Sequence, residues 1–180
     1  MNISEAQENM RRAYFDGGPG MLVSGLAWTI AAFVGLFFSE QASVFTLFIG
    51  GMFIHPGGMA LSKLLGRPGN HDKDNPLGNL TLESTFLLFI GIFIAYTMVL
   101  IRSDLFFPVM LLVIGGRYLV FATIYGNRLY WGIGGLLALA GMLCTMLGAP
   151  FVLGGFLGGG IEIISAVVVM YLAASTDSDL

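Results

Sequence analysis

Charged side chains are scarce in this sequence. Only 11% of its 180 residues are Asp, Glu, Lys or Arg, whereas 56% are hydrophobic, and the mean hydropathy is +0.84. A soluble domain carries about 25% charged residues, so this composition excludes a soluble domain. The eight basic residues, at a net charge of −3, are also too few for a nucleic-acid-binding surface.

Thiol and imidazole ligands are equally few. Cys144 is the single cysteine, which excludes an intrachain disulfide and a four-thiolate metal site. The two histidines, His55 and His71, lie in different segments. Acidic residues follow His71, but they lack the spacing of a calcium loop or of a zinc site with paired histidines. We therefore expect no metal and no cofactor.

What the sequence has instead is long apolar segments. A membrane-spanning helix needs about 20 mostly apolar residues. Six segments reach that length: 20–38, 43–66, 80–101, 105–126, 129–147 and 151–174. The sequence therefore predicts an all-α, polytopic membrane protein with six transmembrane helices, arranged as three antiparallel hairpins. They form one domain over residues 20–174, and 175–180 form a polar C-terminal tail.

Residues 1–19 precede the first span. Their acidic, polar start lacks the basic region of a signal peptide, so we expect them to stay in the mature protein. Residues 2–15 are typical of a short interfacial helix, begun by Ser4 with Gln7 three positions on, which is the spacing of a capping box. The run of glycine and proline in residues 16–20 then breaks the helix and turns the chain into the membrane.

The basic residues predict how the chain threads the membrane. If the N-terminus is cytoplasmic, Arg102 alone lies outside, Arg117 lies within the membrane and the other six fall on the cytoplasmic side. Positive charge near the ends of spans marks the inside. Both termini are therefore expected in the cytoplasm. The six cytoplasmic residues are Arg11, Arg12, Lys63, Arg67, Lys73 and Arg128.

One connection is long, from about residue 67 to 79, and the same pattern places it in the cytoplasm. It contains Arg67, His71 and Asn75, which are polar groups suited to contact with a partner protein. The pair Asn75-Pro76 is typical of a turn before a helix. A solvated turn and a partner-binding loop are both compatible with these residues.

Besides Lys63 at the cytoplasmic end of its span, four Asp, Glu, His or Arg side chains fall inside the predicted spans. His55, Arg117 and Glu162 each lie about 12 residues from the outer end of their helix, which at about 1.5 Å per residue is ~17 Å deep and close to the midplane. Glu83 lies nearer the cytoplasmic boundary, within reach of a long arginine on the neighbouring helix. An arginine at this depth costs about 3 kcal/mol even by insertion scales, so it must face the interior and find partners.

Two interpretations of this group stay open. As structural glue, Arg117 pairs with Glu83 or Glu162 and fixes the helix packing. As a site, one arginine against two glutamates leaves a carboxylate that binds a proton, a cation or a polar ligand. The leading prediction is a protein that binds or transports a small polar solute or ion. The residues expected to bind this solute or ion are Arg117, Glu83, Glu162, His55 and Tyr118.

The backbone beside two of these residues is unusual. Pro56 follows His55, and the run Gly158-Gly159-Gly160 precedes Glu162. Such positions either break helices around a polar cavity or allow tight helix packing. Ser24 with His55 is the nearest approach to a serine hydrolase, but the two lie at different depths, so we expect no enzyme.

Six motifs extend over most of the chain: Met10-Arg11-Arg12-Ala13-Tyr14, Gly17-Gly18-Pro19-Gly20, Val23-Ser24-Gly25-Leu26, Asn75-Pro76-Leu77, Glu83-Ser84-Thr85 and the segment from Arg117-Tyr118-Leu119 through Tyr125-Gly126. On these motifs the chain resembles an uncharacterised family of small, six-span bacterial membrane proteins. The resemblance implies the bacterial inner membrane and no activity. In size and topology the chain is also similar to the substrate-binding subunits of energy-coupling vitamin transporters. A transporter subunit, a non-catalytic scaffold and a homo-oligomer therefore remain alternatives.

Overall fold

The computed structural model describes residues 1–178, and these form helices and turns with no strand. The helices are α1 (Ile3–Tyr14), η1 (Phe15–Gly17), α2 (Gly18–Phe37), α3 (Glu40–Leu64), α4 (Leu77–Val99), η2 (Ser103–Leu105), α5 (Phe106–Tyr125), α6 (Leu129–Met146) and α7 (Phe151–Ser178). The expected helix boundaries agree with these within about one turn. The polar tail expected at 175–180 is helical as far as Ser178, and residues 179–180 lie outside the described part.

Helices α2 to α7 supply six segments that are long and apolar enough to cross a membrane. Their outward faces are apolar as well. Helix α4, for example, exposes Phe86, Phe89 and Phe93 by 60% or more. A soluble protein seldom exposes contiguous apolar surface of this kind. The chain is therefore a multi-pass membrane protein.

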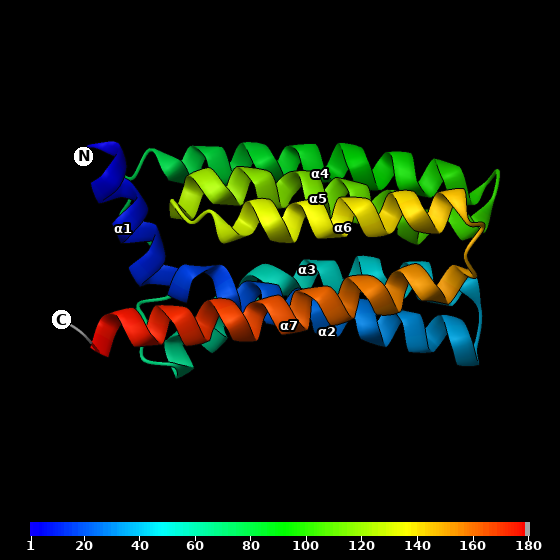
Figure 1. The fold of residues 1–180 in the computed structure, drawn as a ribbon, viewed down its shortest axis with the longest axis horizontal. Helices are drawn as coiled ribbons and strands as arrows, with labels where there is room; N and C mark the ends of the chain where they lie inside the picture. The colour runs from blue at the N-terminus through cyan, green and yellow to red at the C-terminus, as the bar shows by residue number, and fades with distance from the viewer. Residues whose placement is uncertain (179–180) are drawn as a thin grey trace.

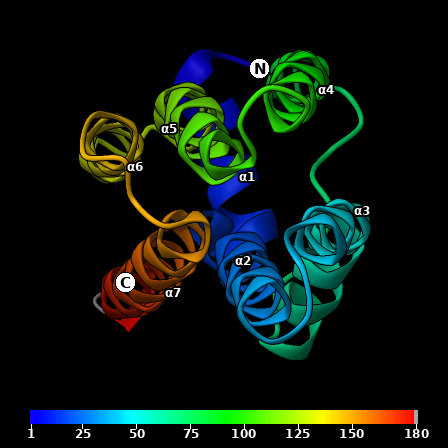
Figure 2. The same cartoon turned by 90° about the vertical axis from the view of Figure 1, so that its right-hand side faces the viewer.

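The six long helices form two layers of three (Figure 2). In one layer α2 packs between α3 and α7, and in the other α5 packs between α4 and α6. Consecutive helices run in opposite directions along the bundle (Figure 1). Helix α7 lies along α2 as well as beside α6, so the last two helices do not form an isolated hairpin.

Aromatic side chains join the two layers at the end of the bundle far from α1. The ring of Phe107 lies with its centroid 5.6 Å from that of Trp28, 5.2 Å from that of Phe106 and 5.0 Å from that of Phe151. Edge-on contacts at these distances are favourable for aromatic rings. The interlayer core is therefore built from α2, α5 and the start of α7.

Tight glycine contacts hold α2 against α7. A Cβ atom on Gly159 would lie 2.9 Å from the carbonyl oxygen of Gly25, and one on Gly25 would lie 2.9 Å from that of Gly159. Only glycine permits such an approach of two backbones. Helix α7 is continuous through this segment, and α3 is continuous through Pro56. Neither helix is therefore unwound beside its polar residue, and of the two alternatives tight packing holds for α7.

Helix α1 lies across one end of the bundle (Figure 1). Its N-cap is Asn2, whose side chain accepts from the amide of Glu5 while the Glu5 carboxylate accepts from the Asn2 amide. The expected cap at Ser4 is therefore wrong. Gln7 is used elsewhere, since its Nε2 donates a 2.8 Å hydrogen bond to the carbonyl of Thr123. The interfacial helix is thus fastened to the last turn of α5, where carbonyl groups lack helical partners.

Candidate functional site

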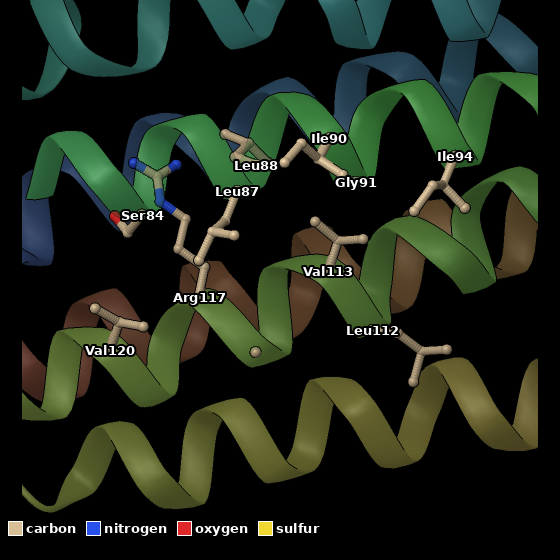
Figure 3. Close-up of a pocket in the computed structure, with 11 residues that line it drawn as sticks. Ser84, Leu87, Leu88, Ile90, Gly91, Ile94, Leu112, Val113, Arg117 and Val120 are labelled. Carbon is tan, nitrogen blue, oxygen red and sulfur yellow. The ribbon is translucent and has the colours of Figure 1, made fainter. Parts of the chain in front are cut away.

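Arg117 extends from α5 to α4 (Figure 3). Its Nη2 donates a 3.1 Å hydrogen bond to Oγ1 of Thr85, and its guanidinium carbon lies 5.2 Å from the ring centroid of Phe121. Its Nε is buried and has no hydrogen-bond partner in the described part of the chain. The cation is therefore held by one hydroxyl and one aromatic face, which leaves donor capacity unused.

A cavity of about 370 Å³ lies between α4 and α5 beside this arginine. Ser84 and Arg117 are its polar lining residues, and the rest of the lining is aliphatic apart from two glycines. Figure 3 shows Ser84 and Arg117 toward one end of the cavity, with Ile94 and Leu112 toward the other. Ligand pockets of proteins range from about 300 to 1,000 Å³, so the cavity is large enough for a small molecule.

Glu162 is the buried carboxylate of the bundle, with 1% of its surface exposed. The hydroxyl of Tyr118 donates a 2.7 Å hydrogen bond to its Oε1. The hydroxyl of Ser24 on α2 lies against the same carboxylate. Its other oxygen, Oε2, is buried and accepts no hydrogen bond from the part of the chain that the structure describes. A buried carboxylate with an unsatisfied oxygen is costly and therefore needs a functional or structural reason.

Helix α5 separates the arginine from this carboxylate. Arg117 and Tyr118 are adjacent in sequence, and adjacent residues of a helix point about 100° apart. Arg117 therefore points to α4, while Tyr118 points to Glu162 on α7. Neither Arg117 nor Glu162 forms an ion pair with any other described residue. Arg117 and Glu162 therefore belong to two half-sites on different faces of α5, about 100° apart.

The structure does not bring His55 and Glu83 to these half-sites. Both side chains are exposed, His55 on α3 and Glu83 on α4. Thr85 rather than Glu83 contacts Arg117. Two residues along a helix turn the side chain through about 200°, so a carboxylate at position 83 faces away when the hydroxyl at position 85 faces α5.

A column of aromatic rings, which the sequence analysis missed, connects Glu162 to the joint between α1 and α2. The ring of Tyr118 is stacked on that of Tyr130 at 5.7 Å, and Tyr130 is stacked on Tyr125 at 5.5 Å. The Tyr130 hydroxyl donates to the backbone carbonyl of Asp16. No local pattern in the sequence pairs Tyr130 with Tyr118, because they belong to different helices.

The three polar residues of the long loop dock it onto α1 and the joint. The Arg67 guanidinium lies 4.4 Å from the ring centroid of Phe15, and Nδ1 of His71 lies 2.8 Å from the hydroxyl of Tyr14. Asn75 is 4% exposed and donates two 2.9 Å hydrogen bonds to α1. These residues fix the fold at this end of the bundle, and a fully solvated turn is the wrong description of the loop.

Three further findings bear on function. Among the residues that the structure describes, no group of three or more His, Cys, Asp and Glu side chains is placed to hold a metal ion. The model of a family of unknown function, DUF7010, matches residues 3–172. No curated protein and no solved structure matches the chain.

Proposed function

The chain belongs to the DUF7010 family of unknown function. From its own geometry we propose that it binds an anion within the membrane and that Arg117 is the residue that binds the anion. The single observation that carries this proposal is the uncompensated cation in the cavity between α4 and α5. No described carboxylate pairs with it, and its Nε has no acceptor among the described groups.

The cost of this arrangement supports the proposal. A guanidinium offers five N–H donors in a fixed fork, and Thr85 accepts from Nη2. A charged side chain within a membrane is costly unless it is paired. A bound anion would remove that cost, because it neutralises the charge and accepts from the unused donors.

Glu162 gives the proposed site a means of coupling anion binding to proton exchange. Its Oε2 lacks a partner among the described residues, and protons commonly move through buried carboxylates of membrane transporters. Helix α5 carries both Arg117 and Tyr118, the hydrogen-bond partner of Glu162. A shift of α5 on anion binding would therefore change the surroundings of the carboxylate. We propose that Glu162 exchanges a proton when the anion binds or moves.

We also propose that both termini face the cytoplasm of a bacterium and that the bundle lies in its inner membrane. Helix α1, the loop before α4 and the C-terminal end of α7 share one end of the bundle (Figure 1). Six of the eight basic residues belong to that end, whereas Arg102 lies in the turn before α5 at the other. Positive charge marks the cytoplasmic side.

The second candidate function is purely structural, because the same hydrogen bonds join neighbouring helices. Arg117 ties α5 to α4 through Thr85, and Tyr118 ties α5 to α7 through Glu162. A scaffold protein needs these bonds for packing and has no ligand to bind. The two candidates differ in what happens when an anion is added.

Thermal unfolding in a neutral detergent separates them. The wild type, Arg117→Met and the control Arg102→Met, which removes an exposed arginine paired with Asp104, are heated with chloride, formate, acetate or phosphate. An anion at 100 times its Kd stabilises the folded protein by about 2.7 kcal/mol. We expect such a rise in Tm for the wild type and Arg102→Met, and none for Arg117→Met. If all three proteins respond alike to every anion, Arg117 has only a structural role in helix packing.

A Glu162→Gln variant tests the coupling. It keeps an oxygen that accepts from Tyr118 but cannot release a proton. We expect anion binding by the wild type to change with pH, and binding by Glu162→Gln to lose that dependence. The same pH dependence in both proteins would exclude Glu162 as the coupled group.

A further inference from the structure

The cavity beside Arg117 is open to the surface of α4 that faces lipid. Three of its lining residues on that helix, Leu87, Ile90 and Ile94, are exposed by 62%, 58% and 47%. We infer that the ligand is an amphiphilic anion, an unbranched aliphatic carboxylate that enters from the bilayer with its acid group on Arg117 and its tail in the cavity. This inference rests on the proposed function and names the class of its ligand.

The hydrogen-bond donors of the cavity lining favour a carboxylate over a polyanion. The hydroxyl of Ser84 already donates a 2.8 Å hydrogen bond to the carbonyl of Thr81, so it has no proton to offer a ligand. Arg117 is then the donor that the cavity lining provides. A carboxylate matches the two-pronged geometry of one guanidinium. Phosphate or sulfate carries more charge and more oxygens than one guanidinium can satisfy.

The shape of the cavity fits a linear tail. Helix α4 lines it from Ser84 to Ile94, which is about 15 Å at 1.5 Å per residue. The two helices touch at Gly91, where an added Cβ would lie 2.4 Å from Val113. They part at Gly116, where an added Cβ would have no described atom within 4 Å. The free space therefore lies next to Arg117 and continues between aliphatic side chains.

Gly116 provides a way to fill the cavity without disturbing the fold. It lines the cavity, and an added Cβ there has no described atom within 4 Å. Gly135 on α6 is a matched control, because it is exposed and an added Cβ there also has no described atom within 4 Å. Gly116→Leu and Gly135→Leu are expected to unfold at the temperature of the wild type.

Photolabelling in phosphatidylcholine nanodiscs tests the inference. The probe is a decanoate analogue with a diazirine in its tail, and the labelled residues are mapped by peptide mass spectrometry. We expect label on α4 and α5 residues of the cavity. Decanoate should compete for the site much better than decanol, which lacks the charge, and than acetate, which lacks the tail. Gly116→Leu should lose about tenfold in affinity for the probe, and Gly135→Leu should match the wild type.

The outcomes separate this inference from the proposed function. If Gly116→Leu labels like the wild type and decanoate competes no better than acetate, no tail occupies the cavity, and the inference fails while acetate binding at Arg117 stands. If decanol competes as well as decanoate, the site is a nonspecific lipid contact and the inference fails. If neither acetate nor decanoate binding responds to Arg117→Met, both proposals fail.

Discussion

Tyr118 on α5 donates a 2.7 Å hydrogen bond to Oε1 of Glu162 on α7, and both side chains are buried. The preceding residue, Arg117, reaches in another direction to Thr85 on α4. Helix α5 thus carries neighbouring contacts to the two half-sites. A movement of this one helix would change both of them, which is the physical basis for the proposed coupling of the anion to the carboxylate.

Removing the Tyr118 hydroxyl should destabilise the protein. Tyr118→Phe leaves a buried carboxylate with less hydrogen bonding, so we expect the free energy of unfolding to fall by about 1–3 kcal/mol. Tyr171→Phe is the control, because Tyr171 is 72% exposed. In a Glu162→Leu background the Tyr118 change should cost measurably less. Equal costs in both backgrounds, measured by chemical denaturation in detergent, would show that the bond contributes nothing.

Two adjacent glycines of α7 should respond differently to substitution by alanine. A Cβ on Gly159 would lie 2.3 Å from Oγ1 of Thr29 and 2.9 Å from the carbonyl of Gly25, whereas one on Gly160 meets no described atom within 4 Å. Gly159→Ala should therefore destabilise the packing of α2 on α7 by about 1–3 kcal/mol. Gly160→Ala should be tolerated. Similar melting temperatures for the two variants would contradict the close approach of these helices.

The joint between α1 and α2 should depend on Gly17. This residue has φ +81°, and an added Cβ would lie 2.6 Å from the hydroxyl oxygen of Tyr130. An L-residue in the left-handed region costs about 1–2 kcal/mol, and the clash adds to that. Gly17→Ala should lower Tm and expose the joint to protease. Gly20→Ala, which has no described neighbour within 4 Å, should do neither.

The loop before α4 should be released when Asn75 is replaced. Its side chain donates to the carbonyl of Ala6 and to Oδ1 of Asn9. Asn75→Ala removes both bonds, so trypsin should cut at Lys73 faster than in the wild type. Asn70→Ala changes an exposed asparagine of the same loop and should leave the rate unchanged. Equal rates in the two variants would show that the loop is held by other contacts.

The proposed membrane topology can be tested in intact cells by cysteine labelling. In a Cys144→Ser background, one cysteine is placed at Asp74 in the long loop or at Ser103 in the turn before α5. An impermeant maleimide should label Ser103→Cys directly and Asp74→Cys only after the membrane is opened. The reverse pattern would overturn the assignment of both termini to the cytoplasm.

The sequence could predict the helices because the length of an apolar run is a local property. It could not predict which side of a helix turns inward, since helices such as α5 are apolar on almost every side. The position of a side chain along its helix can therefore be predicted from the sequence, but the side of the helix on which it lies cannot. For this reason His55 and Glu83 were grouped with Arg117, although both are exposed in the structure.

The glycine run before Glu162 shows the same limit. Whether it breaks α7 or packs it closely depends on what lies opposite, and Gly25 on α2 supplies that surface. Tyr130 was missed because its contact with Tyr118 is made between helices. Glu162 is buried, as expected for a charge in a long apolar helix, whereas Arg117 is half-buried and turned toward α4.

The central claim is that Arg117 holds the acid group of a ligand, and chemical protection of that arginine tests it most directly. The protein in nanodiscs is treated with phenylglyoxal, which modifies arginine, with and without decanoate, and each modified arginine is quantified by mass spectrometry. We expect decanoate to slow modification of Arg117 about tenfold and to leave the exposed Arg102 of the same chain unaffected. Equal modification of Arg117 with and without decanoate, or equal protection of both arginines, would contradict the claim.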